Sequence, residues 1–254
     1  MAHVTIDDDR DLDGLRRAGR AVADACDEML AAVAPGITTA RLDEIGGEVL
    51  ARHGARSAPM LTYGFPGQTC ISVNADAAHG IPSAGTVLRG GDLVNIDVSA
   101  ELDGYWADTG ASTAVGSVDP ARQHLLAATR RAQSEAMNAA RAGKPLRHVG
   151  RAVERCARRH GLQVVANLAG HGIGRGLHEW PSVPSVEDRS DRTMLHEGLV
   201  LAIEPFLTTG PPFVVDADDG WTLRTPLGDP IAQFEHTVVV TAGRPIVLTA
   251  PLAV

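Results

Sequence analysis

The chain has 254 residues, of which 44% are hydrophobic and 21% charged, the balance of an ordinary globular protein that can bury a core. Its formal net charge of −8 and the lack of a basic run disfavour a nucleic-acid partner. No apolar run is long enough to cross a membrane, and the acidic segment from Met1 to Asp13 lacks the regions of a signal peptide. We therefore expect a cytoplasmic protein with no membrane partner.

The three cysteines, Cys26, Cys70 and Cys156, are odd in number, far apart and outside any C-x-x-C spacing. These spacings argue against a disulfide framework and against a thiolate zinc site. We therefore expect all three thiols to be reduced.

Four segments have the apolar spacing and the end signals of helices: 12–34, a segment capped by Thr38 or Thr39 that ends at His53, 120–142, and 146–160. Between them, residues 57–117 combine strand patterns with turns, and the chain becomes strand-like again from Gln163.

A hairpin is predicted in the middle of the chain. Residues 94–99 alternate apolar and polar, so Asp97 lies on the polar face, and Asp103-Gly104 is a strong turn signal. A two-residue loop places Asp108 opposite Ser99, whereas a four-residue loop places it opposite Asp97. Either register brings the two aspartates to one face of the hairpin.

Carboxylates so placed have Cβ atoms roughly 5 to 8 Å apart and repel each other unless a positive charge lies between them. A pair of divalent cations about 3.5 to 4 Å apart fits that gap. The alternative is a solvated hairpin face.

Later segments supply further ligand types. Glu204 ends the apolar run 198–205, and Glu235 is embedded in the run 231–240, where a buried glutamate needs a metal, an arginine or a proton. The run 170–179 is rich in glycine, but its spacing does not fit a dinucleotide loop, so we expect backbone to approach a site closely while His171 and His178 project into it.

Together these residues form a set of four carboxylates and one imidazole: Asp97, Asp108, His171, Glu204 and Glu235. The set suits Mn, Fe(II), Co or Zn, and two divalent ions would neutralise its four negative charges.

The two halves of the chain show an internal sequence repeat. In each half two helices are followed by strands, and the second helices end at Arg52-His53-Gly54 and Arg159-His160-Gly161, about 107 residues apart. This repeat predicts a pseudo-symmetric α+β fold, with helices on one face of a mostly antiparallel sheet and a site between the halves. We expect residues 1–254 to form a single domain, although chance similarity of alanine-rich helices is the alternative.

These motifs closely resemble those of type I methionine aminopeptidases. The resemblance covers residues 12–248 and is carried by the five candidate ligands together with four runs: His79-Gly80-Ile81-Pro82, Gly170-His171-Gly172-Ile173-Gly174, Glu204-Pro205, and Gln233-Phe234-Glu235-His236-Thr237. It implies the pita-bread fold, two divalent metal ions per subunit and a monomeric, single-domain bacterial type of enzyme that acts on peptide or nascent-chain N-termini.

By this resemblance, Asp97, Asp108, His171, Glu204 and Glu235 are the metal ligands, and Asp108 and Glu235 bridge both ions. Glu204 accepts or shuttles a proton, His178 donates to the developing oxyanion, and His79 binds the scissile amide nitrogen. The resemblance also implies that Phe65, Cys70 and Trp221 line a methionine pocket.

Several residues depart from the family pattern, among them Thr62 where an aromatic residue is common and Leu177 near the candidate His178. They motivate an alternative function, a pita-bread aminopeptidase with altered N-terminal residue specificity. A catalytically silent binding protein is a third possibility, but such a protein would be expected to lose ligands, and all five are present.

Overall fold

The computed structural model of the chain describes residue 6 and residues 8–250. It contains five helices in that part of the chain: α1 (Asp9–Ala32), α2 (Thr39–Arg52), α3 (Ala58–Tyr63), α4 (Pro120–Ala139) and α5 (Arg147–Arg159). The four helices predicted from the sequence are confirmed, with ends that shift by a few residues. No helix in the described part of the chain is long and apolar enough to span a membrane.

Side-chain caps explain where the helices begin. The Asp8 carboxylate accepts from the backbone N–H groups of Arg10 and Asp11, so α1 begins three residues before the predicted start. Thr38 and Asp119 cap α2 and α4 in the same way, as their positions in the sequence indicated.

The short helix α3 was not expected, because the whole segment 57–117 was assigned to strands and turns. The Ser57 hydroxyl accepts from the N–H of Met60 at its start, and Gly64 ends it with a left-handed φ of 69°. Local capping therefore creates a helical turn that the apolar pattern alone does not indicate.

The strands are β1 (Arg56–Ser57), β2 (Cys70–Val73), β3 (Asp76–Ala78), β4 (Leu93–Leu102), β5 (Tyr105–Ala114), β6 (Gln163–Val164), β7 (Ala169–Gly172), β8 (Glu179–Pro184), β9 (Val200–Ile203), β10 (Phe206–Thr208), β11 (Val215–Asp216), β12 (Leu223–Arg224), β13 (Ile231–Val239) and β14 (Ile246–Val247).

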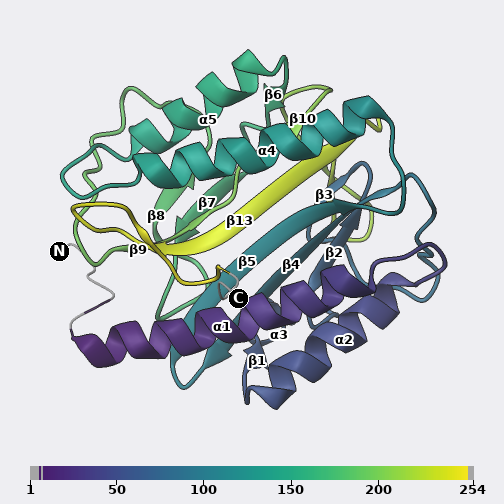
Figure 1. Ribbon diagram of the computed structural model, residues 1–254, viewed down its shortest axis with the longest axis horizontal. Coiled ribbons are helices and arrows are strands. Elements are labelled where there is room, and N and C mark those ends of the chain that lie inside the picture. The colour runs from purple at the N-terminus through teal and green to yellow at the C-terminus, as the bar shows by residue number, and fades with distance from the viewer. Residues whose placement is uncertain (1–5, 7, 251–254) are drawn as a thin grey trace.

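Antiparallel pairing joins these strands. The main sheet has the order β1-β4-β5-β13-β9-β7-β8, with β2, β6, β10 and β14 paired at its margins, and β11, β12 and β3 form a separate small sheet. Strands β5 and β13 run side by side across the middle of the molecule, between the pair α1 and α2 and the pair α4 and α5 (Figure 1). The centre of the sheet therefore joins the two halves of the chain.

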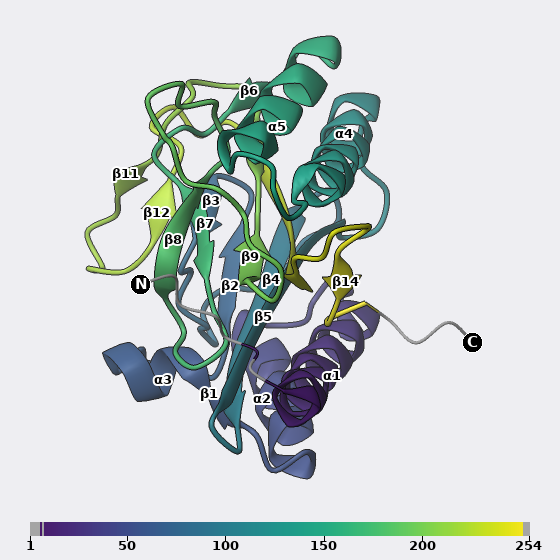
Figure 2. The same ribbon diagram turned by 90° about the vertical axis from the view of Figure 1, so that its left-hand side faces the viewer.

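The two faces of the sheet have different roles. Val94, Ile96 and Val98 of β4 pack against α1 and α2, and Leu201 and Ile203 of β9 belong to the cluster that packs against α4 and α5. Figure 2 shows α1 and α4 on one side of the sheet and α3, β11 and β12 on the other. The four helices expected from the sequence thus lie on one face, as predicted, whereas the unexpected α3 lies on the other. The alternate residues of the central strands point to that second face.

The predicted internal repeat has a structural counterpart. Strand β1 follows α2 and pairs with β4, while β6 follows α5 and pairs with β10. Arg56 and Gln163, the first residues of β1 and β6, are separated by the same interval as Gly54 and Gly161. Each half therefore contributes two helices and an edge strand to one pseudo-symmetric arrangement.

Candidate metal centre and substrate pocket

The β4–β5 hairpin places two of the candidate ligands. Its loop is the two residues Asp103 and Gly104, whose φ angles of 53° and 84° are those of a type I′ turn. The register pairs Ser99 with Asp108, so the two-residue alternative is confirmed and the four-residue alternative is wrong. Asp97 and Asp108 consequently lie diagonally on one face of the hairpin.

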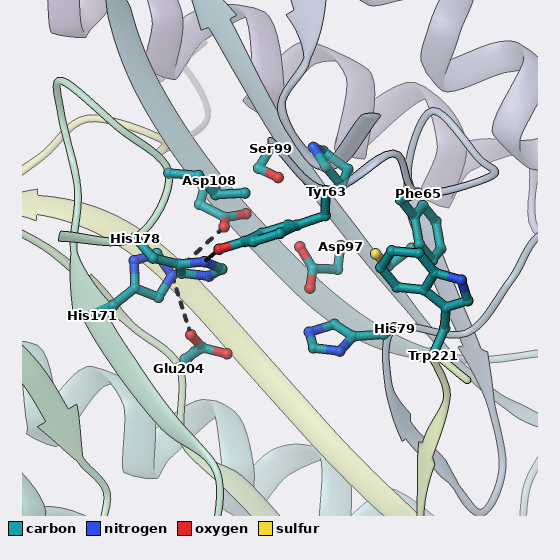
Figure 3. Close-up of a pocket in the computed structure, with 13 residues that line it drawn as sticks. Tyr63, Phe65, His79, Asp97, Ser99, Asp108, His171, His178, Glu204 and Trp221 are labelled. Carbon is teal, nitrogen blue, oxygen red and sulfur yellow. Dashed lines mark hydrogen bonds and ion pairs between the residues drawn. The ribbon is translucent and has the colours of Figure 1, made fainter. Parts of the chain in front are cut away.

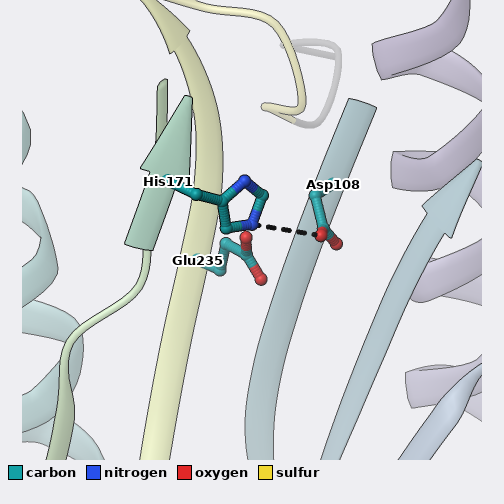
Figure 4. A group of neighbouring side chains, drawn as sticks. All are labelled: Asp108, His171 and Glu235. Atoms are coloured by element: carbon teal, nitrogen blue, oxygen red, sulfur yellow. Dashed lines mark ion pairs between the residues drawn. The ribbon is translucent and has the colours of Figure 1, made fainter. Parts of the chain in front are cut away.

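Neighbouring strands bring the other three candidates to the same place. In β13, Glu235 lies opposite Gly110 of β5, and His171 of β7 lies opposite Ala202 of β9, two residues before Glu204. Figure 4 shows Asp108, His171 and Glu235 projecting toward one another from three different strands. Residues far apart in the sequence thus converge through strand pairing alone.

The distances within this cluster are short. One ligand atom from each of Asp108, His171 and Glu235 lies within 4.8 Å of the others. The His171 Nε2 atom is 3.8 Å from Asp108 Oδ2 and 3.6 Å from Glu204 Oε1. His171 Nδ1 is 2.9 Å from the Gly172 carbonyl oxygen, so it carries the donated proton and leaves Nε2 as a lone-pair donor toward the carboxylates.

No arginine or lysine of the described residues pairs with the four carboxylates. Among the ion pairs of the described residues, none joins an arginine or lysine to Asp97, Asp108, Glu204 or Glu235. The salt-bridge alternative for the two buried glutamates therefore does not hold in the described part of the chain.

The burial of these carboxylates without a basic partner in the described chain shifts the pKa values of the site's titratable groups. Burial raises the pKa of Asp97 to about 6, against a hydrogen bond with Asp108 that acts in the opposite direction. Burial, followed by the charges of neighbouring carboxylates, raises the pKa of Asp108, Glu204 and Glu235 well above the usual range. Burial also lowers the pKa of His171 to about 3, which keeps its imidazole neutral. In its ionised form the cluster therefore needs either bound protons or a bound cation to balance its negative charge.

Two fully buried carboxylate oxygens in the cluster have no hydrogen-bond partner in the described part of the chain. Asp108 Oδ1 and Glu235 Oε1 are buried and unpaired within the described residues, a costly arrangement for acceptors. Anionic oxygens of this kind, next to the free Nε2 of His171, match the donor set that divalent transition metals prefer. The residues present thus fit a metal ion.

The second oxygen of Glu235 is held by a buried amide. Gln233 Nε2 donates to Glu235 Oε2 at 3.0 Å, and Asn95 Nδ2 donates to Gln233 Oε1 at 2.8 Å, which fixes the orientation of the amide. A Cβ on Gly110 would lie only 2.5 Å from Gln233 Oε1, so the glycine leaves the room that this side chain needs. Asn95 and Gln233 were not identified from the sequence as part of the site.

A cavity of about 340 Å³ opens beside the carboxylates. Its polar end carries acidic and imidazole side chains, and its other end is apolar, where the Phe65 and Trp221 rings meet edge to face at 5.2 Å. Figure 3 shows these groups around the pocket. The lining residues are Pro59, Tyr63, Phe65, Cys70, His79, Asp97, Ser99, Asp108, His171, Leu177, His178, Glu204 and Trp221.

Two further imidazoles reach the cavity from opposite halves of the chain. His79 has a left-handed φ of 54°, a conformation that costs energy for a residue with a Cβ and is often found at functional sites. The His178 ring lies edge-on to His171, with ring centroids 4.3 Å apart. Burial lowers the pKa of both His79 and His178, so both are neutral at neutral pH.

The predicted pocket residues Phe65, Cys70 and Trp221 all line the cavity. Thr62 does not: it is exposed, and the adjacent Tyr63 supplies an aromatic side chain to the cavity instead. Ser99 and Tyr63 were not among the predicted site residues. The alternation along β4 placed Ser99 on the correct face, whereas Tyr63 depends on the unexpected helix α3.

A cluster of buried carboxylates and one imidazole, without a basic partner in the described chain and beside an apolar cavity, defines a metal-dependent hydrolase. The chain belongs to the metallopeptidase family M24, whose family model matches residues 13–242. It is therefore a hydrolase of the aminopeptidase type with the pita-bread fold, and it uses divalent metal.

Similar proteins support this assignment over nearly the whole chain. The chain is 46% identical to methionine aminopeptidase 2 of Bacillus subtilis, covering 97% of this chain and 99% of that protein. It is 45% identical to a methionine aminopeptidase of Staphylococcus epidermidis, covering 95% of this chain and 96% of that protein. The crystal structure of methionine aminopeptidase from Thermotoga maritima superposes with a TM-score of 0.95 at 31% identity, covering 99% of this chain and 100% of that chain.

Proposed function

We propose that the chain removes the initiator methionine from peptides and nascent proteins. The observation that carries this proposal is the apolar end of the cavity next to the carboxylate cluster. Phe65, Cys70 and Trp221 offer a surface on which an unbranched, polarisable thioether packs well. The names of the similar proteins from Bacillus subtilis and Staphylococcus epidermidis support the same substrate.

We propose that two divalent ions, drawn from Co, Mn, Fe(II) and Zn, are held by Asp97, Asp108, His171, Glu204 and Glu235. Asp108 and Glu235 would each offer a buried oxygen that has no hydrogen-bond partner in the described residues. Bound there, the ions supply Lewis acidity and a hydroxide nucleophile at neutral pH.

The protein's own groups perform the remaining steps in this proposal. Glu204, whose pKa is raised by burial and by Asp97 and Asp108, takes up a proton from the attacking water and delivers it to the leaving amine. The neutral His178 donates to the carbonyl oxygen as negative charge develops, and His79 binds the scissile amide nitrogen. The chain would act as one domain over residues 1–254, as a monomer in the cytoplasm.

Peptide hydrolysis tests the proposed substrate. Metal-depleted protein should release methionine from Met-Ala-Ser once Mn, Co, Fe(II) or Zn is added, and should process the Leu-, Ala- and Pro-initiated analogues far more slowly. One missing or extra methylene in an apolar pocket is worth about 1 to 3 kcal/mol of discrimination, so residual cleavage of the leucine peptide is compatible with the proposal.

Release of another residue with methionine left in place would instead support an aminopeptidase of altered specificity. Leu177 in the cavity wall is the observation that favours this second candidate. Inactivity with all four metals would contradict both functions and leave a binding role.

Replacing Gln233 by methionine should weaken metal binding about ten- to hundredfold, the usual effect of losing a hydrogen bond to a metal-binding side chain. The variant leaves Glu235 Oε2 without the donor that orients it. Titration of the metal-depleted protein with Co²⁺, followed by absorbance, measures the affinity. Gln163→Met, at an exposed position in β6, is the matched control, and equal affinities for the two variants would refute the orienting role of Gln233.

A further inference from the structure

A contact across the mouth of the cavity is not used by the mechanism above. The Tyr63 hydroxyl, at the end of α3, is hydrogen-bonded to His178 Nδ1, although the two residues are 115 positions apart in the sequence. Their rings are 5.5 Å apart, and both residues line the cavity. Figure 3 shows the Tyr63 ring lying across the pocket with its hydroxyl at the His178 ring.

We propose that Tyr63 is a positioning residue that holds His178 in the tautomer whose proton is on Nε2. This inference rests on the proposed function, in which His178 donates a hydrogen bond to the substrate carbonyl oxygen. It assigns a role to a residue of α3, an element that contributes no acid, base or metal-binding group to that mechanism.

The direction of the hydrogen bond follows from the chemistry of the two groups. A neutral imidazole has one nitrogen that donates and one that accepts. The accepting nitrogen, with an ordinary pKa of about 6.5, is a much stronger base than a phenol oxygen, so the favoured arrangement has the Tyr63 O–H donating to Nδ1. The single ring proton of His178 then resides on Nε2.

The Nε2 atom is left available by the protein. No other hydrogen bond or ion pair of the His178 ring is found among the residues that the structure describes. Without the Tyr63 hydroxyl, both neutral tautomers would be populated, and only one of them could donate from Nε2. Fixing the tautomer in advance raises the fraction of molecules that are ready to stabilise an oxyanion.

The backbone around Tyr63 is held firmly enough to position its hydroxyl. The Ser57 hydroxyl caps the start of α3 and also donates to the Gln68 carbonyl at 2.7 Å. After the helix, Phe65 is buried and donates its N–H to the Pro59 carbonyl at 3.3 Å. Tyr63 therefore lies between two anchored positions, although half of its own surface is exposed.

The kinetic test is a double-mutant cycle with Tyr63→Phe and His178→Ala, using Met-Ala-Ser and the metal that activates the wild type best. Tyr63→Phe should lower kcat about five- to tenfold with little change in KM, since it removes one hydrogen bond of ordinary strength that matters in the transition state. The same substitution should have no further effect in the His178→Ala background. Thr62→Ala, at the exposed neighbouring position on α3, is the matched control and should match the wild type.

A second readout does not depend on activity. In protein labelled with ¹⁵N-histidine and depleted of metal, long-range ¹H–¹⁵N spectra identify which ring nitrogen of each histidine carries the proton. We expect the Nε2–H form for His178 in the wild type and a mixture in Tyr63→Phe, with the His178 signals identified by their loss in His178→Ala.

The outcomes separate the two proposals. If the wild type releases no methionine with any metal, the proposed function fails, and the tautomer spectra alone decide the role of Tyr63. If the wild type is active, the inference is overturned by an unchanged tautomer in Tyr63→Phe, by an unchanged kcat, or by the same fold loss with and without His178. That last result would mean that Tyr63 contacts the substrate directly.

Discussion

Glu204→Gln should fold as the wild type does and release methionine at least about a hundredfold more slowly, since a positioned general acid or base contributes about 10² to 10⁴ to a rate. The amide keeps the shape of the side chain but cannot take up a proton. Steady-state kinetics with Met-Ala-Ser at saturating metal measure the loss in kcat. Glu197→Gln, an exposed glutamate in the turn before β9, is the matched control.

The folding of this variant can be judged separately from its chemistry. Glu204 is close enough to Asp97 and Asp108 for their charges to raise its pKa, so a neutral amide removes repulsion in the metal-free protein. The metal-free variant is expected to unfold at a temperature equal to or above that of the metal-free wild type. A loss of activity together with early unfolding would assign the defect to structure, and wild-type turnover would refute the role of Glu204 as the proton carrier.

Metal-free protein should lose stability as the pH rises from about 4 to about 6, which is the opposite of the usual behaviour of acids in ion pairs. Burial raises the pKa of Asp97 from its ordinary value of 3.8 to about 6, so the folded state binds more protons than the unfolded state across this window. The contribution of Asp97 to the free energy of unfolding is therefore fully present below pH 3.8, its pKa in the unfolded chain. It is lost as the pH rises through about 6, its pKa in the folded protein. A shift of this size corresponds to a free-energy change on the order of 3 kcal/mol.

Urea unfolding of the chelator-treated protein at several pH values measures the slope of the free energy of unfolding against pH. Asp97→Asn should make the slope shallower, because the amide does not titrate, while Asp108, Glu204 and Glu235, whose pKa values are also raised by burial, still contribute. Addition of metal should reverse the effect at neutral pH: ligand at a hundred times its dissociation constant stabilises the folded state by about 2.7 kcal/mol. If the stability of the metal-free wild type instead rises between pH 4 and pH 6, the carboxylates of the site are not buried without a cationic partner as proposed.

The ligand-rich part of the site was predictable because its signals are local. The alternation along residues 94–99 and the Asp103-Gly104 turn fix the face on which Asp97 and Asp108 lie. Glu204 and Glu235 were recognisable as acids within apolar runs, where burial is costly. The convergence of these residues was inferred from charge balance and resemblance, and strand pairing accounts for it physically.

The residues that were missed depend on long-range geometry. In the sequence, Gln233 is indistinguishable from any other polar residue of a strand. Its hydrogen bond to Glu235 depends on the space left by Gly110, which belongs to another strand. Tyr63 belongs to a helix of six residues, too short for an apolar period to identify. The left-handed backbone of His79 likewise could not be predicted, because only a small minority of histidines adopt that conformation and the sequence does not mark which.

The position of β13 in the chain has a consequence for biosynthesis. This strand is the last long one among the described residues, and it pairs with β5, β9, β10 and β14 at the middle of the sheet. The two halves of the chain can therefore pair only after β13 has been synthesised, and contacts of such large sequence separation form slowly. Until then the emerging chain exposes an unpaired sheet edge, and the group of Asp108, His171 and Glu235 is complete only when β13 brings in Glu235.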